Sequence, residues 1–410
     1  MPKALFTVNL GQVTLKFSSL SDAHKVCSAK PEVRVEGERK RDRVSFKVRL
    51  SDNILNHILV LSRVNYTFGF PLELAKGVSL NKLAKINSSG LREDWWFLSA
   101  SILASEVNSL EELLEAIDEL EAFIHEGTKP SKLRLALTEE WYEEAAKVYP
   151  DASTWEKRLA ELRENLDRET LKLLRDSIKE CYDTFYAKYW RKRERQLLDL
   201  SKELKRAVDV LQPLRKVEEI VKMKFPYDAL EVFLVDIFRN GGGIYGVPPK
   251  RIINISGECA PLLVHLAIAH EAGHLLVSDW RIKLAEEVKE LAREMKVNKP
   301  LALAGLIEEH VVALLQLKAD EHYYGEHRVT HGFMENETFR VAEVVWSKSK
   351  EELGTSWDFV KYMRELLKEL KRSKRVIKEL TKLLNEEYGP NSSDCMCLIG
   401  YPRRFWNVFH

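Results

Sequence analysis

The chain has 410 residues, of which 45% are hydrophobic and 31% are charged, so it is long enough for roughly two or three domains with a sizeable core. Its 64 lysines and arginines nearly balance its 63 aspartates and glutamates, so no net charge favours nucleic acid or an anionic membrane as a partner. Five cysteines, an odd number, argue against a disulfide framework and favour a reducing compartment. No signal peptide opens the sequence and no apolar stretch is expected to span a membrane, which predicts a cytoplasmic protein.

The first fifty residues have the pattern of a β-rich region. Residues 6–10 and 13–17 alternate between apolar and polar side chains on either side of Gly11. A period of two places the apolar side chains on one face of a strand, so these residues predict a β-hairpin. A second hairpin is expected to end in a strand at residues 44–48.

Residues 51–215 are expected to be mostly helical. Ser109 followed three residues later by Glu112 has the pattern of a capping box at the start of a helix. The segment 149–153 marks a boundary before long amphipathic helices that end near Pro213.

The last part of the chain combines short strands with helices. Residues 228–239 and 251–256 are rich in branched and aromatic side chains and predict two strands, separated by a glycine-rich turn at 241–243. Further helices are expected over 357–386. The predicted class is therefore α+β, mostly helical, with a β-rich region, a helical region and a catalytic region at 1–50, 51–215 and 216–410.

The most specific motif follows these strands. His270, Glu271 and His274 form the pattern HExxH inside the apolar run 261–278. Residues four apart share one face of a helix, so the two histidines can bind one metal ion. Glu271 projects to one side, where its carboxylate could take a proton from a zinc-activated water. The pattern predicts a site for one Zn²⁺ per chain, with Glu271 as the general base.

A hydrolytic zinc site needs a third protein ligand and one open position. The residue six positions after His274 is Trp280, which excludes the metzincin pattern with its third histidine. The next candidate segment is an apolar helix that is expected to begin after Asn298, with Pro300 in its first turn.

Two adjacent glutamates, Glu308 and Glu309, interrupt that apolar helix. At 100° per residue, Glu309 shares its face with Gln316, Asp320 and several small residues that permit close approach of another helix. This arrangement favours Glu309 as the third ligand and leaves Glu308 as the alternative ligand or an outer partner. Either Asp320 or Asp279 is expected to orient a ligand histidine.

This combination resembles the gluzincins, the thermolysin-like and aminopeptidase-like zinc metallopeptidases, in which a glutamate of a following helix completes HExxH. The matching stretch here is 306–313, which places the ligand at Glu309, and the resemblance covers 225–332. Glu308 stands where several such families have asparagine, and Ala313 where aspartate is often found. The resemblance implies a small sheet before the HExxH helix, a zinc ion, and hydrolysis of peptide bonds.

Histidines and tyrosines crowd the second half of the ligand helix and the residues after it. Metallopeptidases of this kind commonly use a downstream histidine or tyrosine to stabilise the oxyanion that forms on the substrate carbonyl. The candidates for this role are His310, His322, Tyr323, Tyr324, His327 and His331.

The sequence therefore predicts a cytoplasmic zinc metallopeptidase of the gluzincin type that acts on a peptide or protein, with no nucleic-acid or membrane partner. The rival interpretation is a non-catalytic helical scaffold or interaction protein with a structural or inactive zinc site. The sequence leaves the substrate, the choice between endo- and exopeptidase action, and the oligomeric state open.

Overall fold

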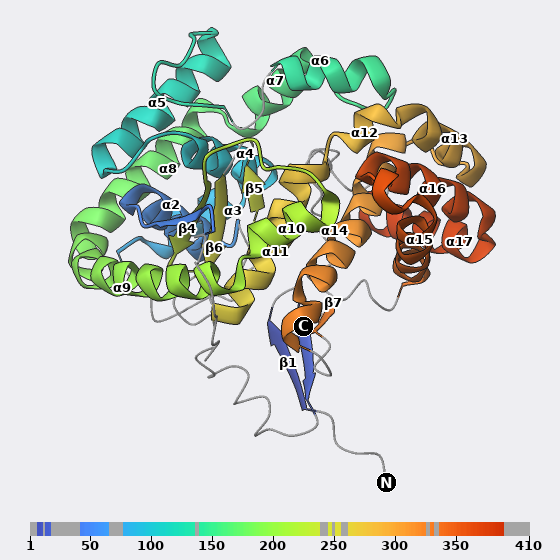
Figure 1. Cartoon of the computed structure of the whole chain (residues 1–410). Helices are drawn as coiled ribbons and strands as arrows, with labels where there is room; N and C mark the ends of the chain where they lie inside the picture. The colour runs from blue at the N-terminus through green and yellow to red at the C-terminus, as the bar shows by residue number, and fades with distance from the viewer. Residues whose placement is uncertain are drawn as a thin grey trace.

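The structure is a computed structural model, and it is mostly helical with short strands, in agreement with the predicted α+β class (Figure 1). It describes the following residues, to which all statements below refer: 6–10, 13–17, 42–64, 77–135, 139–237, 245–247, 251–255, 261–324, 329–331 and 336–388. The predicted glycine-rich turn at 241–243 lies outside the described residues.

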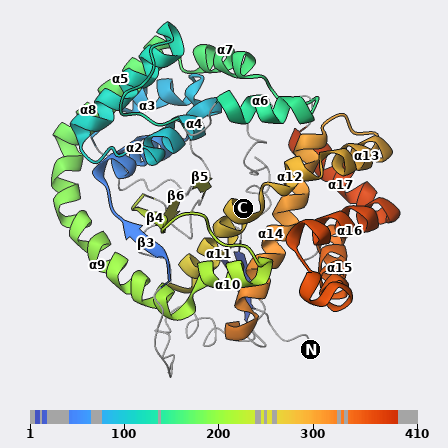
Figure 2. The ribbon, with the colours of Figure 1, turned by 45° about the horizontal axis from the view of Figure 1, so that its top comes forward.

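A first group of helices follows the third strand and covers the region predicted to be helical. The capping box of Ser109 and Glu112 is confirmed, since each side chain accepts a hydrogen bond from the backbone of the other. In Figure 2, α5, α8 and the long α9 curve around the outside of a central sheet. The elements of this group are α2 (Leu50–Leu61), α3 (Leu80–Asn87), α4 (Leu91–Ala104), α5 (Leu110–Glu126), α6 (Glu139–Val148), α7 (Trp155–Asn165), α8 (Arg168–Cys181), the π-helix η2 (Tyr182–Tyr186) and α9 (Ala187–Leu211).

The second group of helices holds the predicted metal-binding residues. Helix α11 lies between the central sheet and α14, and α14 packs in turn against α13, α15 and α17 on its other side (Figures 1 and 2). The elements of this group are α10 (Pro213–Val221), α11 (Pro261–Val277), α12 (Trp280–Lys283), α13 (Ala285–Met295), α14 (Pro300–Tyr324), α15 (Glu337–Leu353), the 3₁₀ helix η4 (Gly354–Ser356), α16 (Phe359–Arg372) and α17 (Lys374–Tyr388).

The central sheet has four described strands in the order β3 (Val44–Lys47), β4 (Leu230–Val235), β6 (Arg251–Ile255) and β5 (Tyr245–Val247). β3, β4 and β6 are parallel, and β5 is antiparallel at the edge. The two strands predicted at 228–239 and 251–256 are thus confirmed and are direct neighbours. The strand predicted at 44–48 is also present, but it pairs in parallel with β4, far along the chain.

A second, smaller sheet lies at the end of α14. β1 (Phe6–Leu10) and β2 (Val13–Phe17) form the predicted antiparallel hairpin, with Val8 opposite Leu15. β2 also pairs with β7 (Val329–His331), which follows α14 in the chain. Residues 13–15 near the start of the chain are therefore paired with β7, the strand that follows the predicted ligand helix in the sequence.

Most of helix α14 is buried in the protein core. Contrary to the prediction that no stretch reaches membrane-spanning length, residues Pro300–Ala319 are long and apolar enough to do so, but 94% of that segment is buried inside the protein. An apolar helix surrounded by other helices and a sheet has the composition expected of a core helix. The polar residues Glu308, Glu309 and His310 at its centre are therefore also buried, and each needs a compensating partner.

Candidate metal centre

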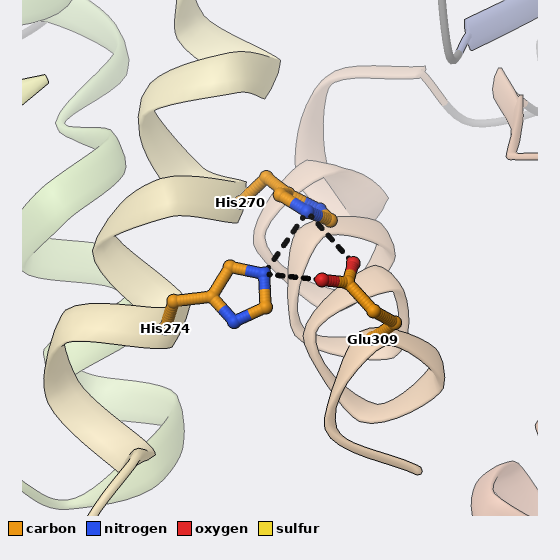
Figure 3. A group of neighbouring side chains, drawn as sticks. All are labelled: His270, His274 and Glu309. Carbon is orange, nitrogen blue, oxygen red and sulfur yellow. Dashed lines mark hydrogen bonds and ion pairs between the residues drawn. The ribbon is translucent and has the colours of Figure 1, made fainter. Parts of the chain in front are cut away.

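The HExxH motif lies in α11, as predicted. His270 and His274, one helical turn apart, point from the same face of α11 toward α14, and their exposed fractions are only 4% and 8% (Figure 3). Glu271, the next residue on the helix, is also buried, with 3% of its surface exposed. The apolar residues around the motif bury it, so this polar group lies in the core between two helices.

Glu309 of α14 completes the group from the opposite side. Figure 3 shows its carboxylate facing both imidazole rings. Its Oε2 lies 3.6 Å from Nε2 of His270, and its Oε1 lies 3.4 Å from Nε2 of His274. The two Nε2 atoms are 3.3 Å apart. Each carboxylate oxygen therefore faces a different imidazole at a similar distance, and no other described His, Cys, Asp or Glu joins the group.

These distances suit a zinc ion. A tetrahedral zinc ion with bonds of about 2.0–2.1 Å holds its ligand atoms about 3.3–3.4 Å apart, close to the spacing of these three residues. Oε1 of Glu309 is buried and accepts no hydrogen bond, although it lies 3.4 Å from Nε2 of His274. A buried carboxylate oxygen without a hydrogen bond is costly, and a metal ion would compensate it. His270, His274 and Glu309 are thus suited to hold one metal ion.

Each ligand histidine is oriented by a second polar residue of α14. Nδ1 of His274 donates to Oε1 of Glu308 at 2.8 Å, and Nδ1 of His270 faces Oε1 of Gln316 at 3.2 Å. An acceptor at Nδ1 fixes the proton there and leaves the lone pair of Nε2 directed into the site. Gln316 therefore contacts His270 from the same face of α14 as Glu309, as the helical spacing predicted.

Glu308 is an outer partner of the site and does not belong to the ligand group. Its carboxylate accepts hydrogen bonds from Nε and Nη2 of Arg281 at 2.6 and 2.5 Å, and from Nε1 of Trp280 at 3.0 Å. With His274 as a fourth donor, both of its oxygens are occupied. The alternative prediction that Glu308 is a metal ligand finds no support in this arrangement, because Arg281 and Trp280 of α12 and the Nδ1 atom of His274 bind its oxygens.

The buried charges favour a cation in the site. Burial by itself would lower the pKa of His274, but the carboxylates of Glu309 and Glu308 outweigh it and raise that pKa. Burial would likewise raise the pKa of Glu309, but the two histidines lower it below its usual value. The same site stabilises either an imidazolium or a metal ion, and metal binding requires neutral histidines. Binding of a metal ion should therefore release a proton.

The glycine of HEAGH determines how closely the two helices approach. A Cβ atom on Gly273 would lie 3.1 Å from Cγ1 of Val312 on α14, tighter than an ordinary van der Waals contact. The valine cannot easily rotate away, because a β-branched side chain in a helix has one strongly preferred rotamer. The missing side chain of Gly273 thus lets Glu309 reach the histidines.

We expect Gly273→Ala to weaken zinc binding measurably. The added methyl group should push α14 from α11 and lower stability by about 1–3 kcal/mol through overpacking, partly offset by the better helix propensity of alanine. Zinc affinity from chelator competition and urea unfolding would measure both effects. The double variant Gly273→Ala/Val312→Ala restores the space and should recover affinity; if it binds zinc no better than Gly273→Ala, the spacing argument fails.

Other residues predicted to serve the site lie elsewhere or outside the described part. His310 is buried and faces the carbonyl of Leu306 through Nδ1 (2.8 Å) and the amide of Asn336 through Nε2 (3.1 Å), so it links α14 to α15. Asp279 is exposed and pairs with Lys283, so it does not orient a ligand histidine. For six candidates the side chains or the whole residue lie outside the described part: Asp320, His322, Tyr323, Tyr324, His327 and His331.

Arg281 and Trp280 are the site residues that the sequence did not predict. Trp280 was used only to exclude a third histidine, and Arg281 lies in the segment 278–283 among other charged residues, which suggests exposure. Both side chains are almost completely buried. The signal that could have revealed Arg281 is the second glutamate of an apolar helix, because a buried carboxylate that binds no metal needs a cationic partner.

Comparisons of the chain with protein-family models, with curated proteins and with solved structures find no match. The assignment of the site therefore depends on its own geometry and chemistry.

Proposed function

We propose that the chain is a zinc-dependent metallopeptidase of the gluzincin type. The observation that carries this proposal is the buried group of His270, His274 and Glu309, in which the Nε2 atoms and the carboxylate oxygens facing them are 3.3–3.6 Å apart, close to the spacing of zinc ligands. Three protein ligands are typical of catalytic zinc sites, which keep one position for water or substrate, whereas structural sites usually have four.

The roles of the residues follow from this arrangement. A zinc ion in such a site polarises the substrate carbonyl and lowers the pKa of water toward neutrality. Glu271, next to a ligand histidine on α11, would accept the proton of the attacking water and deliver it to the leaving amine. Glu308 and Gln316 would hold the two histidines in the tautomer that directs Nε2 into the site.

The sheet offers a way to bind an extended peptide. β5 is the edge strand of the described sheet and packs against α11, the helix that carries HExxH. An edge strand can pair its free backbone groups with an extended peptide. A peptide bound along β5 would therefore run beside α11, which favours a peptide or protein over a small non-peptide amide as the substrate.

The test begins with the wild-type protein, its zinc content and a peptide library. We expect about one zinc per chain by mass spectrometry, cleavage of library peptides by the zinc-loaded protein, and loss of cleavage with a chelator that returns when zinc is added. Bound zinc without cleavage would replace the proposal by a structural zinc site in a scaffold protein. A chain that takes up no zinc after reconstitution would rule out both the metallopeptidase and the structural zinc site.

A further inference from the structure

The turn between α6 and α7 contacts two helices of the metal centre, α12 and α14, although it belongs to the other group of helices. Tyr149 directly follows α6, and only 1% of its surface is exposed. Its hydroxyl donates to the backbone carbonyl of Arg281, at 2.5 Å. The guanidinium of the same Arg281 binds Glu308, which orients His274. One path of hydrogen bonds thus leads from Tyr149 to a ligand histidine.

The same turn also holds the first residues of α14. Both carboxylate oxygens of Asp151 lie 3.0–3.1 Å from the backbone N–H of Leu301, which donates to them. Lys299, the residue before α14, has no acceptor in its side chain, so the N-terminus of α14 takes its capping acceptor from Asp151, far away in the sequence. A carboxylate at this position also interacts favourably with the helix dipole.

These two contacts place the outer partners of the site relative to each other. Tyr149 holds α12, which carries Arg281 and Trp280, and Asp151 holds α14, which carries Glu308 and Glu309. Two residues separated by one position in a single turn therefore fix both helices. A shift of either helix would lengthen the bonds between Arg281 and Glu308, and small displacements matter in a buried charged network.

We propose that the turn at 149–151 is a positioning element of the metal site, in which Tyr149 and Asp151 act through α12 and α14 to hold Glu308 against His274. This inference rests on the metal site of the proposed function but not on its hydrolytic step. It assigns to the helical region before the sheet a role in zinc binding.

The hydroxyl of Tyr149 can be tested with a matched control. Tyr149→Phe removes only this oxygen, and we expect about a tenfold loss of zinc affinity, the lower end of the effect of outer partners. Tyr362→Phe removes a hydroxyl that donates to the carbonyl of Ala342 from an equally buried position in α16. It should lower stability to a similar extent and leave zinc affinity as in the wild type. Zinc affinity is measured by chelator competition, and stability by urea unfolding of the metal-free protein.

The carboxylate of Asp151 gives a second, independent test. Asp151→Ala removes the acceptor at the start of α14 and should weaken zinc binding, whereas Asp151→Asn keeps an acceptor oxygen and should largely restore it. The control is Asp167→Ala, which removes the cap of α8, where Asp167 accepts from the N–H of Thr170 at 2.6 Å. This control should lower the stability of the protein and leave its zinc affinity unchanged.

The outcomes separate this inference from the proposed function. Zinc affinity equal to that of the wild type in both Tyr149→Phe and Asp151→Ala would overturn the inference, even where both variants are less stable. Weaker zinc binding in these variants but not in their controls would support it, whether or not the zinc-loaded protein cleaves peptides. A wild-type protein without zinc would overturn the metal site itself, and the inference with it.

Discussion

Replacing Glu271 by glutamine is expected to leave zinc bound and to slow peptide cleavage by about 10²–10⁴-fold, the usual contribution of a general base. Glutamine has nearly the same shape as glutamate, but its amide cannot accept and return a proton at neutral pH. Glu271 is not one of the three residues that form the ligand group, so the zinc content should stay close to that of the wild type. Steady-state cleavage of a library-derived peptide and metal analysis of the same sample would measure both quantities.

The control for this variant is another buried glutamate near α11. Glu218 of α10 is 4% exposed and accepts a hydrogen bond from the backbone N–H of Phe225 at 2.6 Å, within a group that does not include the ligands. Glu218→Gln should cost stability but leave the cleavage rate of the folded protein unchanged. A Glu271→Gln protein that cleaves peptide at the wild-type rate would show that the proton acceptor is another group.

The ligand group was predictable from the sequence because it depends on local helix geometry. HExxH fixes two ligands on one helix face, and the angular position of Glu309 beside Gln316 and small residues selects it over Glu308. The structure brings His270, His274 and Glu309 together and places Gln316 beside His270. The same periodicity of apolar residues predicted α11, α14 and most of the earlier helices.

The surroundings of the ligand group were not predictable, because they depend on contacts between distant parts of the chain. Arg281 and Asp151 are charged residues in polar segments, where charge usually indicates exposure, and only the folded chain brings them to Glu308 and to the start of α14. The pairing of β3 with β4 was not predictable for a similar reason: alternating apolar residues predict a strand but do not identify the strand with which it pairs. Asp279, one of the two residues expected to orient a histidine, was chosen for its position close to HExxH along the chain, and it is exposed and pairs with Lys283.

Replacing Glu309 and replacing its neighbour Glu308 should have different effects on zinc affinity and on stability. Glu309→Gln removes a charged ligand, and we expect zinc affinity to fall by more than about 100-fold, beyond the effect of an outer partner. Glu308→Leu should weaken zinc binding by about 10–100-fold because His274 loses the acceptor at Nδ1. It should also lower the free energy of unfolding of the metal-free protein by about 3–5 kcal/mol, because Arg281 is left buried without a counter-charge.

The double variant Arg281→Met/Glu308→Leu separates stability from metal binding. Replacing both members of a buried ion pair by apolar residues of similar size is often neutral or stabilising, so the double variant should recover most of the stability that Glu308→Leu loses. Its zinc affinity should stay as low as that of Glu308→Leu, because no acceptor holds the Nδ1 proton of His274. If zinc affinity returned together with stability, Glu308 would act only by keeping the protein folded. If affinity remains low in a stable protein, the carboxylate of Glu308 sets the orientation of His274, and Arg281 serves mainly to compensate its buried charge.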